Sequence, residues 1–183
     1  MLRNTDQNWG AIAKLLHWFM AVLIFTQIAL GWLAVSWPLS PTKLNLFVWH
    51  KSFGMLMLAL VVVRLLWRLA SPTPALPTDT PRWERTAAHA SHALLYALMI
   101  TMPLSGWVIN SAANIPFRIF WLVPLPHIVA PDKALADMAK TIHLGLFVTL
   151  SLVLVLHIGA ALRHHFIKRN RILVRMLPIG ERK

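Results

Sequence analysis

The chain has 183 residues, of which 57% are hydrophobic and 13% charged, and its formal net charge is +12. A soluble domain carries about 25% charged residues, so this composition excludes an ordinary water-soluble protein and favours one that lies in a bilayer. Cysteine is absent, which excludes disulfides, iron–sulfur clusters and thiolate-bound metals, and because the basic residues flank apolar segments without a nucleic-acid-binding motif, nucleic acid is not an expected partner.

Four apolar segments are long enough to cross a bilayer, which takes about 20 residues. The first predicted span covers residues 15–35 and carries no formal charge. It is longer than the h-region of a signal peptide, about 7–15 residues, so we expect it to be retained. The second span covers 48–69, the third 86–109 and the fourth 141–162. We therefore predict an all-α integral membrane four-helix bundle, with residues 1–183 as a single domain.

The connections between the spans are mostly short. The one after the second span contains four prolines, at positions 72, 74, 77 and 81, which favour a stiff, extended chain. The one from residue 110 to residue 140 is the longest, and we expect it to form a small cap over one end of the bundle. An even number of spans puts both termini on the same side of the membrane.

Lysine and arginine are distributed unequally between the two sides of the predicted bundle. Of the 18, 13 lie on the side of the termini and five on the other. The five are Lys43, Lys51, Arg118, Lys133 and Lys140. The positive-inside rule therefore predicts that both termini are cytoplasmic.

Six of the nine histidines fall within the predicted spans. They are His17, His50, His89, His92, His143 and His157. Ionisable residues at membrane depth are costly and usually functional. A single histidine would be explained as well by an interfacial or hydrogen-bonded position, but six among four short helices favour ligands.

The depths of four histidines predict how they pair. His143 and His157 are 14 residues apart, which is close to four helical turns, so they face the same direction about 21 Å apart along the axis. His50 enters its span from the outer side and matches His143 in depth, whereas His17 enters from the cytoplasmic side and matches His157. Two histidines on facing helices at one depth suit a six-coordinate haem iron. The spacing therefore predicts two haems, and the absence of a Cys-x-x-Cys-His motif favours haem b.

A histidine-lined metal transporter is the main competing interpretation, because histidine also binds zinc. Transport sites usually add carboxylates near the midplane. All six acidic residues lie outside the predicted spans, namely Asp6, Asp79, Glu84, Asp132, Asp137 and Glu181. Their positions disfavour cation transport and proton pumping through carboxylates.

Four further histidines lie toward the cytoplasmic side. His89 and His92 are one turn apart in the third span, and His164 and His165 follow the fourth. Either of the first two could replace His17 as a ligand, but His17 would then have no role. A quinone carbonyl needs a hydrogen-bond donor and, on reduction, protons, which a histidine beside the cytoplasmic haem can supply. For His164 and His165, interfacial anchoring is an equally good interpretation.

Several short motifs occur in a fixed order along nearly the whole chain. They are Leu16-His17-Trp18, His50 with Gly54, the run from Val62 to Leu69 followed by Ser71-Pro72-Thr73-Pro74, His89-x-x-His92 before Leu95-Tyr96, the His143/His157 spacing, Ala161-Leu162-x-His164-His165 and Leu173-x-Arg175-Met176-Leu177-Pro178. Together they resemble the bacterial cytochrome b561 family of small four-helix, di-haem membrane cytochromes linked to quinone.

The resemblance carries expectations about cofactors and substrates. It implies haem ligation at the same four histidines as the depth argument, quinone contacts at His92 and His164, and a place in the bacterial inner membrane. Similar proteins oxidise superoxide to oxygen at the outer face and reduce ubiquinone near the inner haem. Other members are electron carriers, and membrane cytochrome subunits of hydrogenases have a related layout, so transfer from a dehydrogenase partner to quinone stays open as an alternative.

Three lysines on the outer side lie near the predicted outer haem. Lys51 follows His50 directly, and Lys133 and Lys140 approach His143. A positive outer surface would steer a small anion such as superoxide. Contact with lipid phosphates explains the same lysines equally well.

Overall fold

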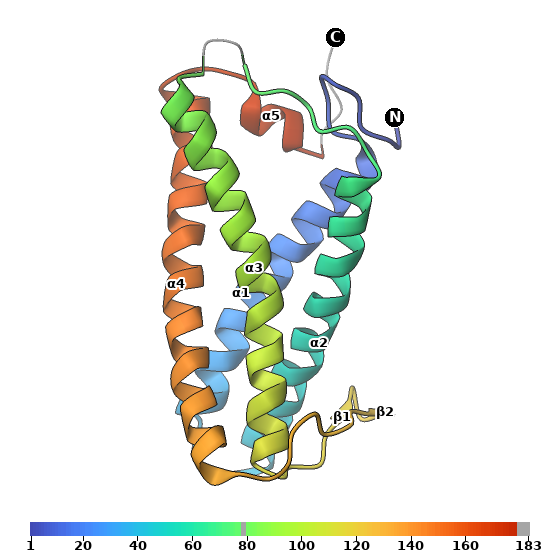
Figure 1. The fold of residues 1–183 in the computed structure, drawn as a ribbon, viewed down its shortest axis with the longest axis vertical. Helices are drawn as coiled ribbons and strands as arrows, with labels where there is room; N and C mark the ends of the chain where they lie inside the picture. Colours follow the sequence, from blue (N-terminus) through green and yellow to red (C-terminus); the bar gives the residue numbers. More distant parts are fainter. Residues whose placement is uncertain (78–79, 179–183) are drawn as a thin grey trace.

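The computed structural model describes residues 1–77 and 80–178. Four long helices run side by side and form one bundle (Figure 1). They are α1 (Ala11–Ser36), α2 (Pro41–Leu69), α3 (Arg82–Ala112) and α4 (Lys133–Phe166). Three short elements complete the fold, namely β1 (Arg118–Ile119), β2 (Val123–Pro124) and α5 (Ile172–Met176). Four residues used in the charge argument, Asp79, Glu181, Arg182 and Lys183, lie outside the described residues.

The surface of the bundle is apolar over most of its length. All four helices are long and apolar enough to cross a membrane, and each contains one predicted span. Large side chains such as Phe25, Leu152 and Val155 are exposed on the outside, while the interior is a small cluster around Met20 and Val61. Because apolar side chains face outward where a soluble protein would be polar, the protein is the integral membrane helical bundle that the sequence predicts.

Local sequence signals mark where two of the helices start, and one proline lies inside a helix. Ser40 caps α2, since its hydroxyl accepts a hydrogen bond from the Lys43 N–H at 3.3 Å. Asp132 caps α4 in the same way, accepting from the Leu135 N–H at 3.0 Å. Pro103 lies inside α3, where it cannot donate to the helix ladder. The α3 segment around Pro103 also faces a candidate ligand, as described below.

The N-terminal segment and α5 lie at one end of the bundle (Figure 1), which we call the terminal end. There, Glu84 is buried, with its side chain 7% exposed. Its carboxylate pairs with Arg163 of α4 at 3.0 Å and with Lys168, just beyond α4, at 2.5 Å. The indole N–H of Trp18 donates to the carbonyl of Met176 in α5 at 2.8 Å. The terminal end is therefore closed by contacts between segments far apart in the sequence.

The opposite end, which we call the loop end, holds the connections at residues 37–40 and 113–132. The longer connection folds back on α3. The Trp107 indole N–H donates to the Pro126 carbonyl at 2.8 Å, and the Ser111 hydroxyl accepts from the Ile128 N–H at 3.2 Å. The strands β1 and β2 within it pair antiparallel as a short hairpin. This connection therefore covers part of the loop end.

Candidate functional site

His50 of α2 and His143 of α4 face each other near the loop end. Their ring centroids are 6.4 Å apart. The His143 Nδ1 lies 2.7 Å from the Ser105 hydroxyl, which also lies 2.7 Å from the Met102 carbonyl. A hydroxyl has one proton, and a carbonyl can only accept. The Ser105 proton therefore goes to Met102, so His143 donates from Nδ1 and its Nε2 keeps a lone pair for a metal.

His17 of α1 and His157 of α4 face each other toward the terminal end, again with ring centroids 6.4 Å apart. Here the neighbour is Arg64, whose guanidinium lies 3.0 Å from the His17 Nδ1 and donates to the Tyr96 hydroxyl at 3.2 Å. Arginine only donates, so His17 accepts at Nδ1. A neutral imidazole carries one proton, which in this arrangement is on Nε2. For Nε2 to bind a metal, the proton must be on Nδ1 instead, so Arg64 would have to give up its contact with Nδ1.

The distance between the two ring centroids of each pair can be compared with the distance expected when one iron is bound between two imidazoles. A ring centre lies about 1.1 Å from its nitrogens and a metal–imidazole bond is about 2 Å long, so two ligands on opposite faces have centroids about 6.2 Å apart. Both predicted pairs match this value at 6.4 Å. The rings of His92 and His157 are 5.5 Å apart, which is too close. The two predicted pairs therefore fit a haem iron better than the alternative with His92.

Glycines on neighbouring helices leave room beside the loop-end pair. A Cβ added at Gly31 of α1 would lie 3.0 Å from the His50 Cε1, and one at Gly106 of α3 would lie 3.5 Å from the His143 Cε1. At Gly145 and Gly159, two residues after the α4 histidines, an added Cβ would meet no described atom within 4 Å. The His50 Nδ1 is buried without a partner among the described residues, which calls for a bound group or water.

Gly31 offers a test of this loop-end site. In Gly31→Ala, the new methyl would press on the His50 ring, because 3.0 Å is shorter than carbon–carbon contact distance. We expect a shifted or partly lost spectrum of the haem at the loop end. Gly145→Ala is the matched control, since its methyl meets open space. Equal spectra for the two variants, recorded on purified protein, would show that Gly31 does not shape this site.

A second group of polar residues surrounds a pocket of about 280 Å³ between α2 and α3. It is lined by Leu65, Arg68, Leu69, His89, His92, Ala93 and Tyr96. The Arg68 guanidinium lies 5.8 Å from the centre of the Tyr96 ring, and the same Tyr96 hydroxyl accepts from Arg64. The structure therefore brings both histidines of the third span to one pocket. Tyr96 lines the same pocket and contacts Arg64, which in turn contacts His17.

The remaining histidines near the terminal end have other surroundings. The His164 Nε2 lies 3.6 Å from a carboxylate oxygen of Glu84, and its Nδ1 lies 2.7 Å from the Asn170 amide nitrogen. The His165 ring packs against Phe166. His164 thus belongs to the ion-pair cluster at the end of α4, and it does not line the pocket that contains His92.

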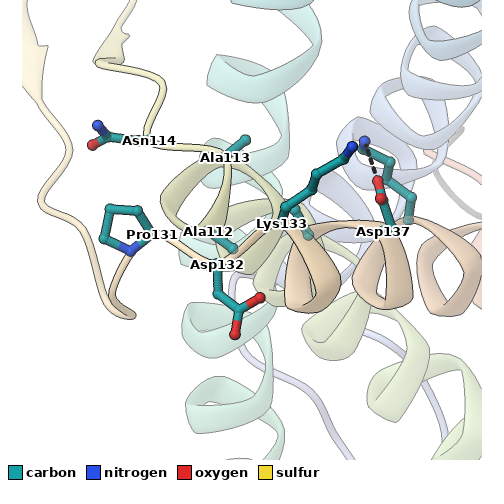
Figure 2. A pocket seen from close by; sticks show the side chains of 9 residues that line it. Ala112, Ala113, Asn114, Pro131, Asp132, Lys133 and Asp137 are labelled. Carbon is teal, nitrogen blue, oxygen red and sulfur yellow. Dashed lines mark hydrogen bonds and ion pairs between the residues drawn. The ribbon is translucent and has the colours of Figure 1, made fainter.

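The three lysines near the loop end differ in their surroundings. Lys51 is held by the Asn110 side-chain oxygen at 2.6 Å and lies over the Phe117 ring. Lys133 and Lys140 line a hollow of about 410 Å³ together with Asp132 and Asp137 (Figure 2). The Lys140–Asp137 ion pair of 2.9 Å is exposed. Acidic side chains therefore lie in the same hollow as Lys133 and Lys140, whereas Lys51 is held by a neutral amide.

Comparison with known proteins shows the family to which nearly the whole chain corresponds. A family profile described as Prokaryotic cytochrome b561 matches residues 8–178. The chain belongs to the prokaryotic cytochrome b561 family. Cytochrome b561 homolog 2 of Escherichia coli (strain K12) is 35% identical over 181 residues, which cover 95% of this chain and 93% of that protein. Cytochrome b561 homolog 1 of the same strain is 27% identical over 172 residues, or 89% and 93% of the two chains.

A third relative has a more specific name. The probable superoxide oxidase CybB of Yersinia pestis is 33% identical over 129 residues, which cover 70% of this chain and 73% of that protein. Membership in the cytochrome b561 family makes this chain a multi-pass bacterial membrane protein of electron transport, in a family that binds haem b. Among residues 1–77 and 80–178, no group of three or more His, Cys, Asp or Glu side chains could hold a metal ion.

Proposed function

We propose that the protein is a di-haem b oxidoreductase that carries electrons across the membrane, from superoxide at the loop end to ubiquinone near the terminal end. His50 and His143 would hold the loop-end haem, and His17 and His157 the other. The observation that carries the proposal is the presence of two histidine pairs with the same 6.4 Å separation, both using α4. When bound, the two haems supply one-electron carriers at two depths of the bilayer.

The reaction balances without a catalytic base at the loop end. Two superoxide ions lose one electron each and become oxygen, and one ubiquinone takes two electrons and two protons to become ubiquinol. Proton uptake is needed only where the quinone is reduced. We therefore expect the residues of the terminal end to supply hydrogen bonds and protons, and those of the loop end to admit and attract a small anion.

The orientation follows from charge. In the sequence, 13 of the 18 lysines and arginines belong to the segments assigned to the side of the termini, so we propose that the terminal end faces the cytoplasm and that both termini are inside. The loop end would then face the periplasmic side of a bacterial inner membrane. In that orientation the quinone takes up its protons on the cytoplasmic side.

Two features support superoxide as the electron donor. The relative from Yersinia pestis is named a probable superoxide oxidase. In this chain, Lys51 directly follows His50, and its ammonium group is held by the neutral side chain of Asn110. No carboxylate takes part in that contact. We propose Lys51 as the main steering charge, and Lys133 and Lys140 as weaker contributors because Asp132 and Asp137 line the same hollow.

The pocket between α2 and α3 supports a quinone site at the terminal half of the bundle. Its volume of about 280 Å³ suits a small ring, and its walls combine apolar leucines with His89, His92, Arg68 and Tyr96, a mixture typical of ligand sites. We propose that His92 donates a hydrogen bond to a quinone carbonyl. For His164, which contacts Glu84, we propose at most an indirect role through the ion-pair cluster.

Kinetics on the haem-loaded protein test the superoxide proposal. Superoxide is added to reconstituted protein with a ubiquinone analogue, and haem reduction and quinol formation are followed by stopped-flow absorbance. We expect fast haem reduction that superoxide dismutase abolishes. Haem reduction that is equally fast with dismutase present would reject superoxide as the donor.

The second candidate is an electron carrier between a dehydrogenase and quinone. It is favoured by the names of the two Escherichia coli relatives, which specify a cytochrome b561 and no substrate. Under this alternative, superoxide would leave the haems oxidised, while quinol would still reduce them through the pocket that contains His92. The two candidates therefore share the quinone end and differ only at the loop end.

A further inference from the structure

A short hairpin beside α2 at the loop end has no role in the proposed electron path. It covers residues 118–124 and consists of β1, β2 and the tip residues Phe120, Trp121 and Leu122. In Figure 1 it projects sideways from α2, away from the other three long helices. Its position is therefore at the periphery of the bundle, where a membrane protein meets lipid.

The base of the hairpin is fixed to the side of α2. The Phe120 N–H donates to the Ser52 hydroxyl at 2.8 Å, and Ser52 is fully buried beneath it. The Phe120 ring packs on Trp49 and Phe53, with centroids 5.8 and 5.3 Å away, and the Trp121 ring packs edge-on against Trp49 at 5.1 Å. Ser52 lies 11 residues after the start of α2, or about 16 Å along its axis. The hairpin therefore lies alongside a membrane-spanning helix, below its end.

Three backbone groups of the tip are paired within the hairpin. The Trp121 N–H donates to the Arg118 carbonyl at 3.2 Å, and the Leu122 N–H donates to the Ile119 carbonyl at 2.9 Å. The Leu122 carbonyl accepts two bonds from the Arg118 guanidinium, at 3.4 and 3.0 Å. These bonds suit a loop that lies against lipid, because unpaired backbone groups are costly there.

Two bulky residues adopt a backbone conformation that favours glycine. Phe120 has φ of 47° and Trp121 has φ of 62°. For residues of this size, such angles are unusual and unfavourable. Glycine or asparagine would relieve the strain, but neither would supply an aromatic ring. The sequence thus keeps large apolar side chains at the tip despite the backbone cost.

The three side chains that follow Phe120 are exposed. Trp121 is 46% exposed, Leu122 73% and Val123 59%. We propose that this tip is a membrane anchor that inserts into the headgroup–acyl boundary of the leaflet at the loop end. Its partner is the lipid surface, with Trp121 at the interface that tryptophan prefers and Leu122 and Val123 in contact with acyl chains.

Spin labelling of single-cysteine variants tests the anchor, and the chain suits this method because it has no cysteine of its own. Leu122→Cys is labelled with a nitroxide and reconstituted into phosphatidylcholine–phosphatidylglycerol vesicles. Accessibility to oxygen, which concentrates in lipid, is compared with accessibility to a water-soluble nickel complex. Val155→Cys on the exposed apolar face of α4 is the lipid control, and Asp137→Cys at its exposed loop end is the water control.

We expect the label at residue 122 to resemble the one at residue 155, with oxygen accessibility several-fold above nickel accessibility. Nickel accessibility equal to that at residue 137 would overturn the anchor, since the tip would then lie in water. Low accessibility to both reagents, with spin–spin broadening, would also overturn it and point to a second copy of the chain. Val123→Cys is a second probe of the same tip, and each variant is accepted only if it elutes as a single peak with haem bound.

Discussion

Replacing His143 with alanine is expected to halve the haem content of the purified protein, from two haems per chain to one. The ring faces His50 at the separation that a shared iron requires, and alanine has no atom that could bind the metal. The haem held toward the terminal end should remain, because His17 and His157 are untouched. Extraction of haem as its pyridine complex, divided by protein concentration, measures the loss, and reduced-minus-oxidised spectra show which haem remains.

The assignment of the four histidines to two pairs also predicts which variants lose the same haem. His50→Ala should leave the same residual spectrum as His143→Ala, and His17→Ala should match His157→Ala with the other haem lost. If His50→Ala instead matched His157→Ala, the pairs would be assigned wrongly. His165→Ala is the matched control, since its ring packs on Phe166 outside both pairs, and it should retain two haems.

The features of the site that the sequence predicted well are those that depend on one helix at a time. A spacing of 14 residues places His143 and His157 on one face of α4 because the helix repeats every 3.6 residues. The depth of His17 and His50 follows from where each apolar segment begins. These rules need no knowledge of neighbouring helices, and the two predicted pairs do face each other in the structure.

The features that the sequence could not supply come from other helices. Gly31 and Gly106 lie against His50 and His143, although neither glycine is near its histidine in the sequence. Ser105 and Arg64 contact ring nitrogens across the bundle. Such contacts depend on the rotation of each helix about its axis, and an evenly apolar helix in a membrane carries little periodic signal to set that rotation.

At the loop end, a count of charged residues in the sequence could not predict which lysines are paired. The sum of basic and acidic residues predicted a positive outer surface, but pairing decides how much of it acts on a nearby anion. Lys140 pairs with Asp137, one helical turn away, while Lys51 is held by a neutral amide from α3. The hairpin likewise could not be predicted, because Phe120 and Trp121 adopt angles that local preferences assign to other residues.

Replacing His92 with alanine is expected to retain both haems but to slow electron exchange with a ubiquinone analogue by roughly tenfold, the factor that corresponds to about 1.4 kcal/mol. His92 lines the pocket between α2 and α3 with Arg68 and Tyr96. Its loss would remove a donor to the quinone carbonyl and a proton source. Stopped-flow oxidation of the reduced protein by the analogue measures the rate.

Comparison with His164→Ala decides whether the pocket or the ion-pair cluster serves the quinone. Both residues are histidines toward the terminal end, but His164 lies beside Glu84 and Asn170 and does not line the pocket. We expect His164→Ala to keep most of the quinone rate and His92→Ala to lose it. The reverse order would move the quinone site to the end of α4. Equal and normal rates in both variants would mean that neither histidine contacts the quinone, while the haem pairs would stand on their own test.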